Sequence, residues 1–296
     1  MRIDEGVLAS LHELTALAPL HQPKSLAALA AVIRELPRTP AVACFDTSFH
    51  ATLPAAAATY ALPAQWRARW GLRRFGFHGL SHAWVARRAP ALLGRRAEGL
   101  ALVSAHLGAG ASLCAIRDGR SIDTTMGFTP LEGLVMATRS GSVDPGLLMW
   151  LLEDGRLTAG ELAHGLEHES GLRGLAGEPD MRAVERRAGA GERDAELALE
   201  VYAHRLRAGI AAMAAALGGI DALAFTGGVG ERAPAVRAAA LDGLGFLGLA
   251  IDGDRNAAAR GDAELSAADA GARTLVIAAR EDLEIARQTR AALSGD

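Results

Sequence analysis

The sequence has little cysteine, few aromatic residues and no excess of either charge. Its 296 residues include two cysteines, Cys44 and Cys114, which form neither a CxxC motif nor a disulfide framework. The 31 basic and 34 acidic residues nearly cancel, which argues against a nucleic-acid-binding surface. The longest uncharged helical run, residues 208–220, is too short to span a bilayer, and Asp4 and Glu5 stand where a secretory signal would be positive. We therefore expect a cytoplasmic protein with no membrane or nucleic-acid partner.

Alanine dominates the apolar half of the sequence, which favours helices in a globular protein. A chain of 296 residues is long enough for two domains of ordinary size. Apolar residues recur at helical spacing in residues 5–17, 25–36 and 194–217, and these segments are predicted to be helices. In the longest of them the residues expected to face inward are Leu197, Val201, Leu206, Ile210, Met213 and Leu217.

The stretch from residue 100 to residue 116 is predicted to be two buried strands around a glycine turn. Residues 100–104 alternate small and large apolar types, Gly108 and Gly110 allow a tight turn, and residues 112–116 return. Asp118 and Gly119 then form a hairpin turn. Backbone N–H groups in such a turn suit a phosphate, although the same pattern fits an ordinary hairpin.

A second glycine segment follows another predicted strand. Residues 222–225 are apolar, Thr226-Gly-Gly-Val-Gly-Glu231 comes next, and Pro234 begins a new helix. A strand, a glycine turn and a helix N-terminus together favour a nucleotide or phosphate site. Residues 169–177 are predicted to be a glycine-punctuated loop, and Asp180 stands at the start of a helix. A final strand, residues 274–278, leads into a C-terminal helix.

Three polar positions are candidate site residues, each with an alternative. Asp46 follows a short apolar run, residues 41–45, predicted to be a strand, so it is either a site carboxylate or a cap. His78 and His82 are spaced as a zinc pair on a helix would be, but we favour His78 in a loop before a helix that starts near Ser81. Arg139, between Thr, Ser and Gly, suits an anionic oxygen cluster or the solvated surface.

Seven segments in order make the sequence resemble the acetate kinase family over essentially the whole chain. They are Ala18-Pro-Leu-His-Gln-Pro23, Phe45-Asp-Thr-Ser-Phe-His50, Arg74-Phe-Gly-Phe-His-Gly79, His106-Leu-Gly-Ala-Gly110, Met126-Gly-Phe-Thr-Pro-Leu-Glu-Gly133, Thr138-Arg-Ser-Gly141 and Phe225-Thr-Gly-Gly-Val-Gly-Glu231. The resemblance implies an α/β protein with the two-domain actin-like and sugar-kinase ATPase fold. It also implies reversible transfer of the γ-phosphoryl group of ATP to acetate, giving acetyl phosphate and ADP, with Mg²⁺.

The resemblance assigns roles to individual residues. His78 and Arg139 correspond to residues that stabilise the transition state, and Asp46 to a catalytic carboxylate that positions metal or substrate. Glu281 corresponds to a metal-associated glutamate, with the neighbouring Asp282 as the alternative. The acetate methyl pocket corresponds to Leu20, Phe77 and Pro130. The nucleotide and its phosphates are assigned to His106, Leu107, Gly108, Ala109, Gly110, Asp180, Met181, Arg182, Gly227, Gly228, Val229, Gly230 and Glu231.

The sequence departs from the family pattern at its start and in one loop. It has no Asn-x-Gly-Ser-Ser-Ser-x-Lys segment and no Gly-His-Arg-x-Val-His-Gly-Gly segment, and Ala109 stands where the family usually has Asn. We expect an incomplete first domain, residues 1–48 joined by the C-terminal helix 281–296, and a nucleotide-binding second domain, residues 49–280. We also expect little activity from this polypeptide alone. The alternatives are a propionate or butyrate kinase and a non-catalytic nucleotide-binding relic, and a complete fold would be a homodimer.

Overall fold

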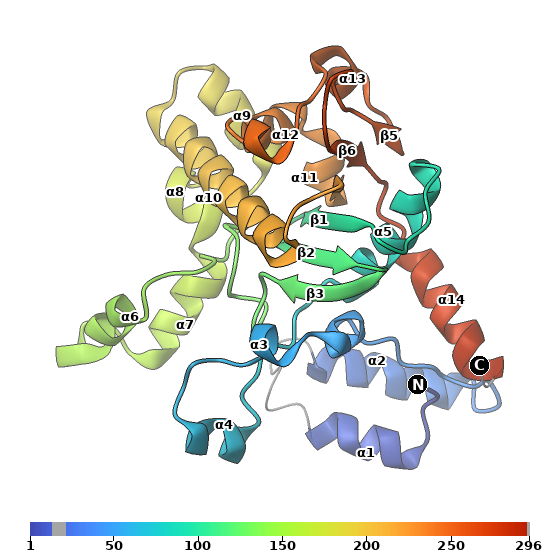
Figure 1. Cartoon of the computed structure of the whole chain (residues 1–296). Coiled ribbons are helices and arrows are strands. Elements are labelled where there is room, and N and C mark those ends of the chain that lie inside the picture. The colour runs from blue at the N-terminus through green and yellow to red at the C-terminus, as the bar shows by residue number, and fades with distance from the viewer. Residues whose placement is uncertain (14–21, 295–296) are drawn as a thin grey trace.

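A six-stranded mixed sheet forms the centre of the computed structural model, which describes residues 1–13 and 22–294 (Figure 1). The strand order is β3-β2-β1-β4-β6-β5. β1 is parallel to β4 and β4 to β6, whereas the other neighbours are antiparallel. The strands are β1 (Ala101–Leu107), β2 (Ala111–Arg117), β3 (Arg120–Thr124), β4 (Ala222–Thr226), β5 (Ala263–Glu264) and β6 (Arg273–Val276).

Helices cover both faces of this sheet, and the α6–α7 and α1–α2 pairs lie farther from it (Figure 1). The α-helices are α1 (Glu5–Glu13), α2 (Gln22–Glu35), α3 (Ala55–Ala58), α4 (Ala64–Trp70), α5 (Gly79–Leu92), α6 (Pro145–Leu152), α7 (Ala159–His168), α8 (Gly171–Ala176), α9 (Met181–Gly189), α10 (Arg193–Leu217), α11 (Gly227–Arg232), α12 (Pro234–Leu241), α13 (Gly253–Ala258) and α14 (Glu281–Ser294). Short 3₁₀ turns are η2 (Ser48–Thr52), η3 (Glu153–Gly155) and η4 (Gly245–Leu247).

Successive side chains of β1 point to opposite faces of the sheet and belong to two separate hydrophobic cores. Val103 and Ala105 belong to the core under α10, and Leu102 belongs to the core under α5. α10 crosses one face of the sheet and α5 packs on the other (Figure 1). The predicted long helix is therefore confirmed, but the expected inward position of Leu197 is wrong, because 49% of this residue is exposed. Tyr202 is a buried residue of α10 that the spacing analysis did not select.

The two predicted glycine segments lie next to each other at one edge of the sheet. β1 and β4 are parallel neighbours, so their carboxyl ends meet, with His106 opposite Thr226. Gly227 has a φ of +78°, and a Cβ there would lie 2.8 Å from the carbonyl oxygen of Leu107. A side chain at this position would separate the two segments. The sequence expected a turn after β4, whereas the chain enters α11 directly.

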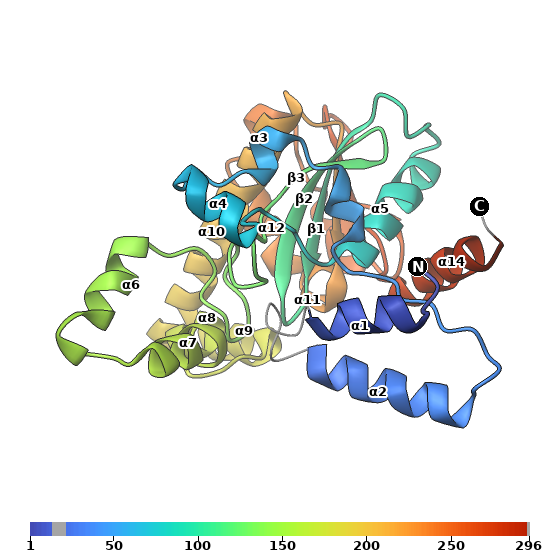
Figure 2. The ribbon, with the colours of Figure 1, turned by 90° about the horizontal axis from the view of Figure 1, so that it is seen from below.

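The N-terminal residues pack against the C-terminal helix. The N-terminus lies beside α14 in two views at right angles, with α1 and α2 next to it (Figures 1 and 2). The amino group of Met1 donates to the carbonyl oxygen of Ala43, and the thiol of Cys44 lies 3.8 Å from the carbonyl oxygen of Ile285. The predicted strand at residues 41–45 is wrong, because only a single bridge, Arg2 to Val42, forms there.

The prediction of a glycine-punctuated loop at residues 169–177 is also wrong in part. This segment contains α8, and Gly177 follows the helix with a φ of +69°. Gly171 at its first position has a φ of +63°, and a Cβ there would lie 2.1 Å from the carbonyl oxygen of Met136. This glycine therefore allows a close approach of two backbones rather than an irregular loop.

Candidate active site

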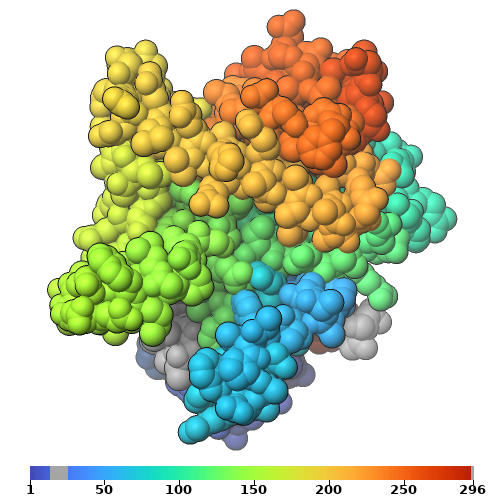
Figure 3. Space-filling model, turned by 60° about the vertical axis from the view of Figure 1, so that its left-hand side comes forward, coloured from blue at the N-terminus to red at the C-terminus, as the bar shows by residue number. Residues whose placement is uncertain are grey.

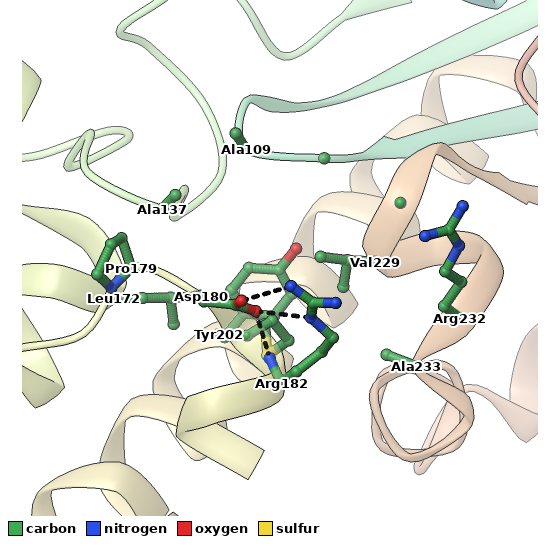
Figure 4. A pocket seen from close by; sticks show the side chains of 13 residues that line it. Ala109, Ala137, Leu172, Pro179, Asp180, Arg182, Tyr202, Val229, Arg232 and Ala233 are labelled. Atoms are coloured by element: carbon green, nitrogen blue, oxygen red, sulfur yellow. Dashed lines mark hydrogen bonds and ion pairs between the residues drawn. The ribbon is translucent and has the colours of Figure 1, made fainter. Parts of the chain in front are cut away.

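A cavity of about 330 Å³ lies where the two glycine segments meet α9 and α10 (Figure 4). It is lined by seven of the residues that the sequence assigned to the nucleotide: Gly108, Ala109, Asp180, Met181, Arg182, Gly228 and Val229. Tyr202 of α10 and Arg232 of α11 line it as well, and neither was predicted. The cavity brings together residues from the turn between β1 and β2, from the loop at Ala137 and from helices α8, α9, α10 and α11.

The other residues that were predicted to bind the nucleotide do not line the cavity. Leu107 is buried in the core of the sheet, and Gly227 and Gly230 are buried where α11 packs against β1. The carboxylate of Glu231 accepts a 3.0 Å hydrogen bond from the backbone N–H of Ala279. Glu231 therefore ties α11 to the segment before α14 instead of lining the cavity.

Asp180 and Arg182 form an ion pair at the start of α9. The Asp180 carboxylate accepts from the backbone N–H of Arg182 at 2.9 Å and from Nη2 of Arg182 at 2.7 Å. The hydrogen bond from the Arg182 side chain is the main cause that lowers the pKa of Asp180 to about 2. Figure 4 shows this pair on the wall of the cavity opposite Arg232. Arg182 is thereby held in place, and Arg232 supplies a further positive group.

His78 and Arg139 meet at Gly110, beside the cavity. A Cβ on Gly110 would lie 2.6 Å from Nη2 of Arg139 and 3.1 Å from Nε2 of His78. Nη1 of Arg139 donates a 2.7 Å hydrogen bond to the carbonyl oxygen of Pro130, which fixes the guanidinium. Gly110 is the last residue of the loop whose Gly108 and Ala109 line the cavity. A guanidinium and an imidazole thus converge on one end of a loop that lines the cavity.

Four histidines lie around this point, of which His50 and His82 are buried and His78 and His106 partly buried, and their surroundings favour the neutral forms. Burial, together with Arg139 and His50, lowers the pKa of His78 to about 4. Burial and His78 lower the pKa of His106 to about 3, and the two rings lie 4.3 Å apart. Burial also lowers the pKa of His50, and it lowers that of His82 well below its ordinary value. His78 is therefore a neutral hydrogen-bonding group at pH 7.

Asp46 and His78 are joined by a direct hydrogen bond. The Asp46 carboxylate accepts from the backbone N–H of His78 at 2.6 Å and of Leu80 at 3.4 Å. His78 has a φ of 55° and immediately precedes α5, so Asp46 satisfies free N–H groups at the start of that helix. Asp46 thus caps the distant helix α5, whereas no hydrogen bond to its side chain comes from η2, the turn that directly follows it, among the described residues. The zinc interpretation of His78 and His82 has no support, because no group of three metal-binding side chains occurs among the described residues.

Glu281 lies near Asp46 at the start of α14. Burial and the charge of Asp46 raise the pKa of Glu281. Asp282 instead forms an exposed ion pair with Arg280 at 2.9 Å. Two carboxylates that repel each other are a suitable environment for a hard cation, which binds one or two carboxylates and keeps water or phosphate oxygens as its other ligands. This chemistry fits Mg²⁺ at Asp46 and Glu281, whereas the Asp282 carboxylate is paired with Arg280.

The residues assigned to the acetate methyl pocket are described only in part. Phe77 precedes His78 and packs against the core under α10. Pro130 is held by Arg139 through its carbonyl oxygen. Leu20 lies outside the described residues. Phe77 is thus the neighbour of His78 in sequence, and Pro130 is hydrogen-bonded to Arg139.

Sequence analysis missed the serines that contact these histidines. Ser81 lies 2.8 Å from Nδ1 of His106, and Ser112 lies 2.9 Å from Nδ1 of His78. Ser104, on β1, lies 2.8 Å from Nδ1 of His82. A signal was present, because Ser104 and Ser112 interrupt two otherwise apolar strands that were predicted to be buried.

None of the described helices is both long and apolar enough to cross a bilayer. The sequence pattern of the Acetokinase family matches residues 1–287. An acetate kinase from Gloeobacter violaceus is 50% identical over 97% of this chain and 71% of the relative.

Solved structures agree with this match. A crystal structure of Porphyromonas gingivalis acetate kinase has a TM-score of 0.94 and 38% identity over 99% of this chain and 74% of that one. A propionate kinase from Francisella tularensis has a TM-score of 0.92 and 36% identity, over 97% of this chain and 74% of that one. These matches confirm the expected actin-like ATPase fold. The chain belongs to the acetokinase family.

Proposed function

We propose that this chain transfers the γ-phosphoryl group of ATP reversibly to acetate, giving acetyl phosphate and ADP. One observation carries the proposal: Arg139 and His78 converge on Gly110, at the end of the loop whose first two residues line the cavity. A nucleotide in the cavity would direct its phosphates along this loop toward the two side chains. Family membership supports the same reaction.

The chemistry requires positioning and charge neutralisation more than covalent participation. A carboxylate oxygen of acetate attacks the γ-phosphorus, and the bond to the oxygen that bridges the β- and γ-phosphates breaks, leaving with ADP. Arg139 is a permanent cation, so it can neutralise charge on the equatorial oxygens of the transferred group. Neutral His78 can donate one hydrogen bond there.

Mg²⁺ is proposed at Asp46 and Glu281. The raised pKa of Glu281 beside Asp46 supports this assignment. When bound, the ion would neutralise phosphate oxygens of the nucleotide. The carboxylate of Asp46 would then serve two purposes, because one oxygen already accepts the 2.6 Å hydrogen bond from His78.

A propionate kinase activity is the second candidate, supported by the similarity to the Francisella propionate kinase. Phe77 and Pro130 lie beside the reacting pair, so they are placed to select the acid by size. One added methylene changes discrimination by only about 1–3 kcal/mol. We therefore expect propionate to be a slower substrate than acetate.

The test is formation of acyl phosphate by the purified chain, trapped with hydroxylamine, with acetate, propionate or butyrate. We expect acetyl hydroxamate that depends on ATP and Mg²⁺, formed at a low rate because the sequence has no Asn-x-Gly-Ser-Ser-Ser-x-Lys segment. Arg139→Lys keeps the charge but loses the planar fork and should lower kcat at least tenfold. Arg156→Lys, at an exposed ion pair, is the matched control. Binding of ATP without any acyl phosphate would instead favour a nucleotide-binding relic.

A division into two domains also belongs to this proposal. Residues 1–48 with α14 form one domain and residues 49–280 the other, which is supported by the contacts of Cys44 with Ile285 and Thr289.

A homodimer is also proposed, through α6. This helix has no charged residue and exposes Leu147, Met149, Trp150 and Leu152. The green α6 and α7 segment projects from the body in Figure 3. The guanidinium of Arg156 lies 4.2 Å from the centre of the Trp150 ring, so this surface carries one charge at its edge. A second copy fits the surface because two such helices would cover each other with apolar side chains on both sides.

A further inference from the structure

A buried chain of hydrogen bonds runs from the sheet to the imidazole of His78. Oγ of Ser104 lies 2.8 Å from Nδ1 of His82, and Nε2 of His82 lies 2.8 Å from Oγ of Ser112. The Ser112 hydroxyl lies 2.9 Å from Nδ1 of His78. Ser104, His82 and Ser112 are each 0% exposed. We propose that these three are positioning residues that hold the proton of His78 on Nε2.

The direction of the chain follows from counting protons. A hydroxyl donates one hydrogen bond, and a neutral imidazole has one N–H and one acceptor nitrogen. Among the described residues the side chain of Ser104 has a single partner, Nδ1 of His82, so its proton is donated there. His82 then carries its proton on Nε2 and donates to Ser112. Ser112 in turn donates to Nδ1 of His78, which leaves the proton of His78 on Nε2.

The opposite direction leaves a buried proton without an acceptor. Nδ1–H of His78 would donate to Ser112, which would donate to Nε2 of His82, and Nδ1–H of His82 would donate to Ser104. The hydroxyl proton of Ser104 would then have no acceptor in the part of the chain that the structure describes. An unsatisfied donor in a site closed to water is costly, so the first direction is favoured.

The count holds because both imidazoles are neutral at pH 7. His82 is 0% exposed, and the guanidinium of Arg139 meets Nε2 of His78 at Gly110, so a positive charge on either ring is disfavoured. The charged or titratable groups that influence the pair are His50, His106 and Arg139, and each disfavours an imidazolium. Each ring therefore carries one proton, and the serines decide on which nitrogen.

The consequence for catalysis depends on Nε2 of His78. This atom faces the backbone of Gly110, where the guanidinium of Arg139 also arrives. With the proton on Nε2, His78 donates a hydrogen bond to an oxygen of the transferred group, whereas the other tautomer would present a lone pair to it. This catalytic consequence rests on the proposed function, but the tautomer does not.

The first test reads the tautomer directly. In protein labelled with ¹⁵N-histidine, long-range ¹H–¹⁵N correlation spectra at pH 7 distinguish a protonated from an unprotonated ring nitrogen. Loss of signals in His78→Gln assigns the resonances. We expect His78 to carry its proton on Nε2 and His82 on Nε2. A proton on Nδ1 of His78, or protons on both nitrogens, would overturn the proposal whatever the enzyme activity.

The second test removes the residue that sets the direction. Ser104→Ala touches neither His78 nor the cavity, yet it should give a mixture of His78 tautomers and lower kcat, by up to about tenfold, with the KM values unchanged. Ser104→Thr keeps the hydroxyl and should restore both. Ser121→Ala is the matched control, because Ser121 is equally buried and bonds Nδ1 of His50 at 2.9 Å outside this chain.

The two tests separate this inference from the proposed function. A single Nε2 tautomer in an inactive protein would support the hydrogen-bond chain and count against the kinase reaction. An unchanged His78 tautomer in Ser104→Ala would show that Ser104 does not set the direction. An equal loss of kcat in Ser104→Ala and Ser121→Ala would show a general effect of cutting a buried bond, and would also overturn the proposal.

Discussion

The carboxylate of Asp46 holds the backbone N–H of His78 at 2.6 Å across 32 residues of sequence. The same carboxylate is proposed to bind Mg²⁺, so capping and metal binding must be separated. Asp46→Asn keeps an oxygen that accepts from the N–H but removes the charge. We expect a small fall in the thermal midpoint, because the N–H of Leu80 loses its acceptor, and a large rise in the Mg²⁺ concentration needed for half-maximal activity. Asp46→Ala should also lose about 1 kcal/mol of stability. If Asp46→Asn needs no more Mg²⁺ than the parent, the metal role is wrong.

Gly110 leaves no room for a side chain. Gly110→Ala would push against Nη2 of Arg139 and Nε2 of His78, and displacing either by about 1 Å should lower kcat about 100-fold. Gly165→Ala in α7 is the control, because a Cβ there meets nothing within 4 Å. That variant should keep kcat and gain about 0.5–1 kcal/mol of stability. Steady-state kinetics and urea unfolding of both variants test this. A fully active Gly110→Ala would refute convergence at this point.

Acid should destabilise the fold through the buried histidines. The folded-state pKa of His78, about 4, is below its unfolded value near 6.5, so the unfolded chain binds more protons between these values. Stability is therefore complete above pH 6.5 and decreases as the pH falls toward 4, by up to about 1.4 kcal/mol per pH unit for one histidine. His106 acts in the same direction. Urea unfolding at pH 7, 6 and 5 measures the slope, and His106→Gln should reduce it. A slope unchanged in that variant would contradict the assignment.

Ala109 lines the cavity and is exposed, so the loop can accept a larger side chain. Ala109→Asn adds an amide that can donate to a phosphate oxygen. A hydrogen bond to a charged group contributes about 1.5–3 kcal/mol, so kcat/KM for ATP should rise at least about tenfold. Ala109→Val offers similar bulk without a donor and should give no gain. An equal response of the two variants would show that the amide is not what the loop lacks.

The proposed homodimer depends on the apolar surface of α6. Met149 is 61% exposed and Trp150 is 51% exposed. Trp150→Glu would bury a charge in the interface and should convert the dimer to a monomer, as measured by light scattering after gel filtration. Trp70→Glu, on the exposed Trp of α4, is the control. A parent protein that is already monomeric at high micromolar concentration would refute the dimer.

Prediction from sequence succeeded where a local pattern determines the structure. Asp118 and Gly119 both have positive φ, 53° and 72°, as their residue types predict for a two-residue hairpin turn. α10 begins and ends within one residue of its predicted bounds because apolar spacing and a left-handed Gly218 define it.

Prediction failed where structure depends on distant neighbours. Residues 41–45 are apolar, but a strand needs a partner along its length and only Val42 finds one, at Arg2. Seven of the nucleotide residues that motif matching supplied line one cavity, whereas Ser104 and Tyr202 were missed. Their importance comes from what faces them across the fold, and no spacing within one segment reveals that.

The hydrogen bond from the backbone N–H of Ala279 to the Glu231 carboxylate connects α11 directly to the segment before α14. Glu231 belongs to the helix that forms one wall of the cavity, and Ala279 lies two residues before Glu281. One carboxylate thus fixes the distance between the residues that would surround the nucleotide and the residue proposed to hold its metal. A shift of α11 would be transmitted to α14 over a single hydrogen bond, so the two halves of the site keep a common alignment.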